Sequence, residues 1–373
     1  MMSLMPFGYL FVFILVFGTT LSLSSLHWLS IWAGLEINLM GFIPILIYSG
    51  ASREAESAMK YFIMQALGSG MIMLGSLMSF DIFMSWETGA SNSLFIGLFP
   101  LIFGLMLKLG SFPFHFWLPS VMAGVSWMAC LILTTWQKLA PLFLLATLVI
   151  MYQSSTFFLS FFLLLMAALS SLVGGIGGLN QTQVRALLAY SSIGHMGWLL
   201  LCSVVGMSTL KIYFLIYLMI SVSLFMSLWS SEKSLFSQAS TLEPMKSKIY
   251  EVTVIFMLLS LGGMPPLLGF FSKWIAIWSS LMSSFYLPLL PLLLGSLISL
   301  FYYLSLLFSI TLLSGTYLTT LSLFLDKTNF SSQLNLKTLN MKSNFSFLVV
   351  FIFSVNAIGG IFIFMALPIF NFL

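Results

Sequence analysis

The stretch LKLGSFPFHFWLP at residues 107–119 interrupts a long apolar run with glycine and proline. The stretch GGMPPLLGFFSKW at residues 262–274 does the same later in the chain. Proline removes a helical hydrogen bond and glycine loosens the turn, so both stretches predict broken helices. Each break also carries a lysine, Lys108 or Lys273, within apolar surroundings. Each predicted broken helix therefore carries a charged residue beside its break.

The composition around these stretches indicates that most of the chain lies in lipid. Of its 373 residues, 60% are hydrophobic and only 6% are charged, whereas a soluble domain carries about 25% charged residues. A water-exposed surface of this chain would lack polar cover. Apolar runs of about 20 residues, the length that a helix needs to cross a bilayer, recur from end to end. Because the runs are continuous and not alternating, they predict helices and not a β-barrel.

The predicted fold class is an all-α polytopic membrane protein with about eleven transmembrane helices. The expected spans are residues 4–23, 26–48, 57–80, 93–111, 123–150, 155–178, 183–205, 209–230, 250–281, 286–313 and 346–367. The fourth span is followed by a short amphipathic piece ending at Pro119, the ninth is broken in its middle, and the fifth is expected to be unbroken.

The two breaks lie five spans apart, which predicts two five-helix units, each with a broken fourth helix. An odd number of helices makes the second unit inverted, and paired broken helices in inverted repeats indicate a transport site near the membrane midplane. The expected divisions are residues 1–152, 153–313, a polar loop at 314–345 and a C-terminal helix within 346–373.

Loop charge predicts the orientation of the chain. The loops after even-numbered spans hold nine basic residues, namely Arg53, Lys60, Arg185, Lys233, Lys246, Lys248, Lys327, Lys337 and Lys342. The loops after odd-numbered spans hold only Lys211. The positive-inside rule therefore puts the N-terminus on the positive side, the matrix in a mitochondrion, and the C-terminus on the other. The N-terminal residues have no basic region before the first apolar run, so neither a cleaved signal nor a transit peptide is expected.

Four charged residues fall inside apolar spans: Glu36, Lys108, Lys138 and Lys273. A charge at the bilayer centre costs about 2.5–3.5 kcal/mol on insertion scales, so these side chains are expected to face the bundle interior, water or one another. Burial generally lowers the pKa of a lysine and raises that of a glutamate, which lets both exchange protons near neutral pH. A proton relay is the functional interpretation, and a static ion pair that fixes helix packing is the structural alternative.

Other titratable residues are weaker candidates. His195 lies midway along the seventh span and can pass a proton between its two ring nitrogens, although a packing role is an equal alternative. His115 lies next to the first break. Lys60 begins the third span, where reaching to the lipid headgroups explains it as well. Cys130 and Cys202 have neither CxxC spacing nor a nearby histidine pair, so neither a metal site nor a disulfide is expected.

The sequence contains no motif for redox chemistry. The glycine-rich run at residues 174–178 lies at a helix end and lacks the strand–turn–helix context of a dinucleotide site. No cysteine set could hold an iron–sulfur cluster, and the net charge of +4 is spread over loops and forms no nucleic-acid patch. The chain alone is therefore expected to bind no cofactor and to carry no electrons.

These motifs resemble the antiporter-like membrane subunits of respiratory complex I, in particular the animal mitochondrial subunit 2 branch. The resemblance rests on the two broken-helix stretches, on TWQKLAP at residues 135–141, and on NQTQVR at residues 180–185 followed by AYSSIGHMGW at residues 189–198. The matches follow the family order from about residue 28 to residue 275. There are departures: Ser120, Ala186 and Ser272 replace the residues that are usual in the family, and the tail beyond about residue 315 is longer.

The resemblance implies a function and partners. Glu36, Lys108, Lys138 and Lys273 match the family's proton-pathway carboxylate and lysines, and Lys60 matches a further family lysine. The implied protein is a core subunit in the mitochondrial inner membrane that translocates protons, while NADH oxidation and ubiquinone reduction occur elsewhere in the complex. FMN, iron–sulfur clusters and ubiquinone are then expected in other subunits. Neighbouring antiporter-like subunits and lipid, including cardiolipin, are the expected partners, and nucleic acid is not.

Two other hypotheses fit the residues. A stand-alone cation/proton antiporter would also contain inverted repeats and buried lysines. A membrane scaffold without chemistry would use the same charges only for assembly, and neutralising Lys108 or Lys273 would then leave proton pumping unchanged.

Overall fold

The computed structural model describes residues 8–48, 50–83, 95–152, 157–231, 247–265 and 267–325, together with residues 354, 356, 359 and 360. Every regular element in these ranges is a helix. The helices are α1 (Gly8–Ser24), α2 (Trp28–Leu46), α3 (Ser52–Phe83), α4 (Phe95–Leu109), α5 (Trp117–Gly124), α6 (Trp127–Thr134), α7 (Trp136–Tyr152), α8 (Phe157–Gly178), α9 (Val184–Val205), α10 (Met207–Ser231), α11 (Ser247–Gly262), α12 (Leu268–Met282) and α13 (Leu289–Leu325).

The helices have the length and the polarity of a membrane bundle. Within the described ranges, seven helical segments are long and apolar enough to cross a membrane, and three shorter helices are apolar as well. Large apolar side chains such as Phe13 and Phe301 are exposed, whereas Asn38 and Lys138 are buried. A bundle that exposes large apolar side chains and buries its charged and amide side chains suits lipid as its solvent. The predicted all-helical membrane class is thereby confirmed.

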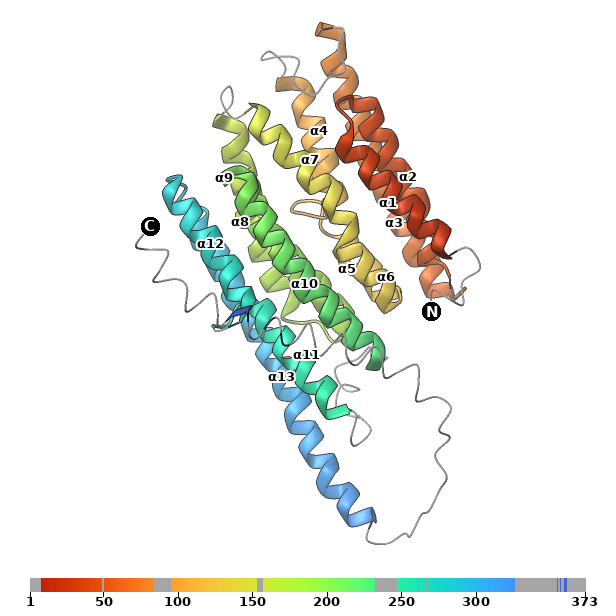
Figure 1. Ribbon diagram of the computed structural model, residues 1–373, viewed down its shortest axis with the longest axis vertical. Coiled ribbons are helices and arrows are strands. Elements are labelled where there is room, and N and C mark those ends of the chain that lie inside the picture. Colours follow the sequence, from red (N-terminus) through yellow and green to blue (C-terminus); the bar gives the residue numbers. More distant parts are fainter. Residues whose placement is uncertain are drawn as a thin grey trace.

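The helices lie side by side in one elongated bundle (Figure 1). Helices α1, α2 and α3 lie at one side, and α12 and α13 lie at the opposite side, with α7, α9 and α10 between them. The closest helix pairs are α1 with α2, α3 with α4, and α8 with α9, while α13 packs on α8. This arrangement puts α9 at the centre, in contact with α5, α7, α8, α10 and α12.

Both predicted helix breaks are present and are built in the same way. Gly110 after α4 and Gly263 after α11 adopt positive φ angles of 69° and 82°. In each case the next residue donates its backbone N–H to the carbonyl five residues earlier, at 3.2 Å in the first break and 3.1 Å in the second. This pattern is the Schellman motif, in which glycine tolerates the left-handed conformation and the last helical carbonyls are satisfied.

The predicted unbroken fifth span is wrong, because it consists of α6 and α7 with an interruption at Thr135. The hydroxyls of Thr134 and Thr135 donate to backbone carbonyls of the preceding turn, that of Thr135 to Leu131 O at 2.6 Å. Such bonds compete with the helical ladder and bend it. Pro141 also lacks the N–H that the carbonyl of residue 137 would receive. The interruption lies just before Lys138.

Other boundaries also differ from the expected ones. The short helix after the first break begins at Trp117 and continues past Pro119 to Gly124. Proline near a helix start costs little because its missing N–H has no helical partner there. Helix α13 continues to Leu325, so the first part of the expected polar loop is helical. The expected span at residues 346–367 lies almost wholly outside the described residues.

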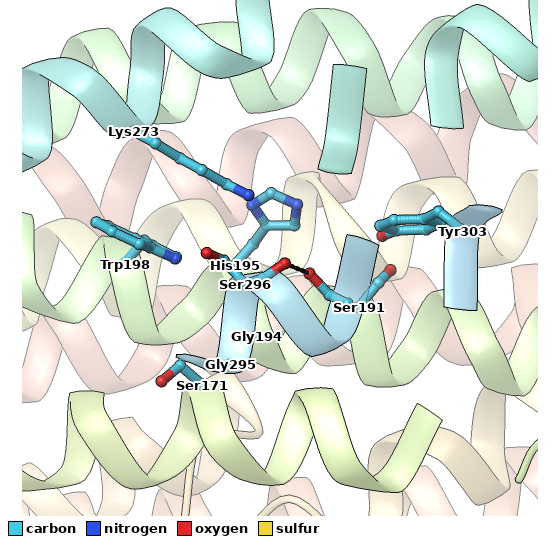
Figure 2. Close-up of a pocket in the computed structure, with 10 residues that line it drawn as sticks. Ser171, Ser191, Gly194, His195, Trp198, Lys273, Gly295, Ser296 and Tyr303 are labelled. Carbon is cyan, nitrogen blue, oxygen red and sulfur yellow. Dashed lines mark hydrogen bonds between the residues drawn. The ribbon is translucent and has the colours of Figure 1, made fainter. Parts of the chain in front are cut away.

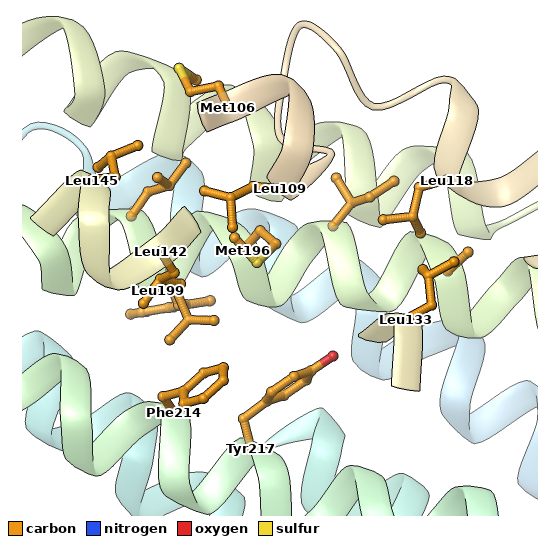
Figure 3. Close-up of a cluster of buried hydrophobic side chains, with 14 of the residues drawn as sticks. Met106, Leu109, Leu118, Leu133, Leu142, Leu145, Met196, Leu199, Phe214 and Tyr217 are labelled. Atoms are coloured by element: carbon orange, nitrogen blue, oxygen red, sulfur yellow. The ribbon is translucent and has the colours of Figure 1, made fainter. Parts of the chain in front are cut away.

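A cluster of apolar side chains from several helices fixes the centre of the bundle (Figure 3). It includes Leu109 of α4, Leu142 of α7, Met196 of α9 and Phe214 of α10, each at most 3% exposed. Interiors of this kind are close-packed. The cluster therefore holds the polar groups of α7 and α9 at defined positions.

Candidate functional site

Lys273 lies at the second helix break, where it contacts the end of α11. Its side chain is buried, and its Nζ donates to the carbonyl oxygen of Gly262 at 2.8 Å. That carbonyl belongs to the last residue of α11, where the helix dipole is negative and attracts a cation. The break thus creates the acceptor that holds the lysine, and glycine at position 263 leaves room for the side chain, whose Nζ would lie 2.9 Å from an added Cβ.

Lys138 is the second buried lysine, and it is held by a different helix. Its Nζ donates to the carbonyl oxygen of Ser192 in α9 at 3.3 Å and lies 5.8 Å from the ring centroid of Tyr217 in α10. The side chain is 2% exposed. A carbonyl oxygen and an aromatic face are both favourable partners for a cation in a low-dielectric interior. Lys138 is therefore oriented towards the α9–α10 interface.

His195 lies between these two lysines. Both Lys138 and Lys273 are near enough to act on its ring electrostatically. A hydrogen bond of 3.0 Å joins its Nδ1 to the Tyr213 hydroxyl, and its ring centroid lies 5.2 Å from that of Tyr217. The structure thus brings together three predicted relay residues, contributed by α7, α9 and α12.

A small polar cavity adjoins this group (Figure 2). Its volume is about 10 Å³, and its lining includes His195, Lys273, Ser191 and Tyr303. The Lys273 side chain points towards the imidazole ring of His195 in this view. A cavity of this size has room for about one water molecule. The two titratable groups therefore face a common space within the bundle.

Glu36 and Lys108 form a second group in the first half of the chain. The Glu36 carboxylate lies near enough to act electrostatically on Lys108 of α4 and on the buried hydroxyl of Tyr61 in α3. Among the described residues, Glu36 and Lys108 form no direct ion pair. The Lys108 side chain is buried and packs beside Gly68. Proton exchange between the two would therefore need an intervening water.

The other two candidates lie apart from both groups. The Nζ of Lys60 is 2.6 Å from a carboxylate oxygen of Glu56, and both side chains are largely exposed, at 48% and 67%. Exposed ion pairs of this kind contribute little to the stability of the fold. His115 is buried in the first break, where its ring stacks on Phe112 and contacts Phe116. The Nδ1 atom of His115 has no hydrogen-bond partner among the described residues.

Sequence reasoning missed the groups that position the lysines. Asn38 of α2 and Gln137 of α7 exchange two amide hydrogen bonds of 3.1 and 3.2 Å, directly beside Lys138. Tyr217 contacts both Lys138 and His195. The only sequence signal for these groups was a polar residue inside an apolar span, and such a signal does not identify the residue that it contacts.

Asn356 is a further missed residue, and it fixes the helix that carries Lys273. Its Oδ1 accepts the backbone N–H of Leu268, the first residue of α12, at 3.3 Å. Its Nδ2 contacts the sulfur of Met257 in α11 at 3.1 Å. Leu267 provides no side-chain cap for α12, so Asn356 supplies the acceptor that a capping residue normally provides. A residue near the end of the chain thus links both halves of the broken helix.

Replacing Asn356 with leucine is expected to loosen the start of α12. Loss of a helix-capping acceptor costs about 0.5–2 kcal/mol, and the unbonded N–H of Leu268 would then exchange with solvent more often. Hydrogen–deuterium exchange should be measured on the purified unmodified protein and on the leucine variant. The first turn of α12 should exchange roughly 2- to 30-fold faster in the variant. The α2 helix is the internal control and should be unchanged. Equal exchange at α12 in both proteins would contradict the capping role.

Comparisons with known proteins agree with this architecture. The family model for the transmembrane part of NADH:quinone oxidoreductase and Mrp antiporters matches residues 25–301. NADH-ubiquinone oxidoreductase chain 2 of Lumbricus terrestris is 42% identical over 79% of this chain and 84% of its own length. The chain 2 protein of Myxine glutinosa is 43% identical over 79% and 83%.

Solved structures share the fold. A chain of respiratory complex I from Thermus thermophilus matches with a TM-score of 0.78 and 24% identity, covering 96% of this chain and 79% of that one. A chain of the Mrp complex from Dietzia matches with a TM-score of 0.73 and 15% identity, covering 80% and 59%. At these identities the likeness concerns the fold alone. The family match over most of the chain, together with the identity to curated relatives, shows that this protein belongs to the NADH-ubiquinone oxidoreductase chain 2 family.

Proposed function

We propose that this chain is the proton-translocating, antiporter-like membrane subunit of mitochondrial respiratory complex I. NADH oxidation and ubiquinone reduction take place elsewhere in that complex and drive the translocation. The observation that carries the proposal is the group of Lys138, His195 and Lys273, in which two buried lysines flank one imidazole. Titratable groups buried in a membrane bundle are costly and mark proton pathways.

The geometry of this group supports a stepwise proton transfer. Each lysine is stabilised as a cation by one carbonyl oxygen, from Ser192 for Lys138 and from Gly262 for Lys273. Like charges repel strongly in a low-dielectric interior, so a proton arriving at Lys138 disfavours one on Lys273. His195 lies between them and can take up a proton on one ring nitrogen and release one from the other. The imidazole thus links Lys138 of α7 to Lys273 of the broken helix α11–α12.

Glu36 and Lys108 are proposed as the entry pair of the first half. In this scheme the Glu36 carboxylate stabilises the Lys108 cation when the two are close, and separation of the pair releases the proton. Because no direct ion pair joins them in the described structure, the transfer needs water. The proposed order is Glu36, Lys108, Lys138, His195 and Lys273, and Lys60 and His115 are assigned no step.

The proposed topology has eleven membrane crossings in two inverted five-helix units, residues 1–152 and 153–313, followed by a C-terminal helix. The shared Schellman geometry after α4 and α11 supports the repeat, since both breaks follow the fourth helix of their unit. The N-terminus is proposed to face the matrix and the C-terminus the intermembrane space. Neighbouring membrane-arm subunits and lipid are the proposed partners, with flavin, iron–sulfur clusters and ubiquinone bound by other subunits.

A stand-alone cation/proton antiporter is the second candidate, because the matching family also contains Mrp antiporters. Purification of the native protein in mild detergent separates the two. We expect the chain to migrate with a large assembly that contains flavin absorbance and iron–sulfur signals in electron paramagnetic resonance. Migration as a lone oligomer without these signals, accompanied by sodium–proton exchange in vesicles, would contradict the complex I assignment.

A further inference from the structure

A pair of amide side chains connects the helix that carries Glu36 with the helix that carries Lys138. Asn38 of α2 donates from its Nδ2 to Oε1 of Gln137 in α7 at 3.1 Å, and Gln137 donates from its Nε2 to Oδ1 of Asn38 at 3.2 Å. Two donors and two acceptors are thereby paired, and such bonds are stronger in a low-dielectric interior than in water. Helix α2 packs mainly on α1 and α3. The amide pair therefore joins α2 to a helix that is not one of its main neighbours.

Helix α2 presents Glu36 and Asn38 on opposite sides. Residues two positions apart in an α-helix point about 200° away from each other. The Glu36 side faces Lys108 of α4, on which the carboxylate acts electrostatically, whereas the Asn38 side faces α7. Gly18 of α1 permits a close approach here, because an added Cβ would lie 2.6 Å from the backbone nitrogen of Asn38. A shift of α2 that changes the distance between Glu36 and Lys108 therefore also moves Asn38.

On the other side of the pair, Gln137 directly precedes Lys138 at the start of α7. Both residues lie between the interruption at Thr135 and the proline at position 141. Pro141 offers no N–H to the carbonyl of Gln137, and the Thr135 hydroxyl competes for a backbone carbonyl of the preceding turn. Both features weaken the helical hydrogen bonds around Lys138. Side-chain contacts then fix this turn, namely the amide pair on one side and the bond from Lys138 to the Ser192 carbonyl on the other.

We propose, on the basis of the proposed proton pathway, that the Asn38–Gln137 pair is a positioning link that holds Lys138 at the Ser192 carbonyl, in a fixed place relative to the Glu36 helix. Neither amide is titratable, so the pair carries no proton itself. It acts through the backbone of α7, where Gln137 and Lys138 are consecutive residues. The Glu36–Lys108 group and the Lys138–His195–Lys273 group thus keep a defined relation across the weakened start of α7.

The first test replaces each amide by an apolar side chain of similar size, as Asn38→Leu and Gln137→Met, in the assembled complex. A displacement of about 1 Å can slow a positioned transfer about 100-fold. The number of protons translocated per NADH oxidised, measured in proteoliposomes and compared at equal amounts of complex, should therefore fall towards the level of a Lys138→Met variant. The double variant N38L/Q137M should show no further loss, because either substitution alone breaks the pair.

The exchanged variant, N38Q/Q137N, tests whether the two amides act as a pair. It keeps one long and one short amide across the same gap, so it should restore most of the proton yield. Thr147→Val is the control on the same helix, since it removes an exposed hydroxyl that bonds to Leu144 within α7. We expect its proton yield to equal that of the unmodified complex. Reduced yields in both single variants without recovery in the exchanged one would show that each amide acts alone, which would overturn the link.

A density map of the Q137M complex measures the position of Lys138 directly. We expect its Nζ to have left the Ser192 carbonyl, from which it lies 3.3 Å away in the unmodified chain. A Lys138 side chain that keeps this contact, or an unchanged proton yield in N38L and Q137M alongside a reduced one in K138M, would overturn the inference and leave the proposed function intact. An unchanged yield in K138M would instead remove Lys138 from the pathway, and the map alone would then decide whether the amide pair positions it.

Discussion

Replacement of Lys138 by methionine is expected to abolish this subunit's share of proton translocation while the complex still assembles. Methionine has a similar length and an apolar end, so it fits the space between α7, α9 and α10. It cannot carry a proton from α7 towards His195. The loss should appear as fewer protons translocated per NADH oxidised, measured with a pH-sensitive dye in proteoliposomes that contain the purified complex.

The amount of assembled complex distinguishes a role of Lys138 in proton transfer from a purely structural role. A charge at the bilayer centre costs about 2.5–3.5 kcal/mol on insertion scales, and its removal eliminates that cost. Among the described residues, one hydrogen bond, to Ser192 O, and the contact with the Tyr217 ring are lost with it. A typical hydrogen bond contributes about 1 kcal/mol net, and a cation–ring contact contributes a similar amount. The methionine variant should therefore assemble at least as well as the unmodified chain. A scaffold role predicts the opposite, namely reduced assembly with normal pumping in the complexes that form.

Lys211→Met is the matched control for Lys138→Met. Lys211 is a lysine in a neighbouring helix, but its side chain is exposed. The same substitution there should leave both the proton yield and the amount of complex unchanged. An unchanged proton yield in Lys138→Met would remove this lysine from the pathway. An equal loss in both variants would show that the assay responds to charge in general.

The helix breaks could be predicted from the sequence because their causes are local. Gly110 and Gly263 adopt the left-handed conformation that ends each helix, and a proline follows each of them within three residues. The interruption at Thr135 was missed, although its causes are also local, because threonine hydroxyls only weaken a helix. Glycine and proline are strong sequence signals for a helix break, whereas threonines whose hydroxyls bond to the preceding turn are a weak one.

The partners of the charged residues could not be predicted, because they come from distant parts of the chain. Lys138 donates to the carbonyl of Ser192, 54 residues away, and Asn356 caps a helix that begins 88 residues earlier. A backbone carbonyl has no sequence signature, so neither contact leaves a pattern to find. The burial of Lys273 was correctly expected, but the acceptor at Gly262 became visible only in the folded bundle.

Replacement of Gly174 by alanine is expected to have the second-largest effect, and it acts on the packing of α8 against α9. A Cβ at this position would collide with the backbone of Gly194 and would lie 2.7 Å from the carbonyl oxygen of Tyr190. Both obstacles are backbone atoms, so no side-chain rotation relieves them. Small residues allow such close helix contacts in membranes. The collision would move α9, which carries His195 and the carbonyl that holds Lys138.

The expected cost of Gly174→Ala is about 1–3 kcal/mol from overpacking, partly offset by about 1 kcal/mol of better helix propensity. The purified complex should therefore unfold at a lower temperature, and its proton yield should fall because the α9 groups shift. Gly70→Ala on α3 is the control, since a Cβ there meets nothing within 4 Å and the substitution gains helix propensity alone. If the two alanine variants share the same unfolding temperature and proton yield, the α8–α9 contact is looser than the structure indicates, and α9 does not depend on it for its position.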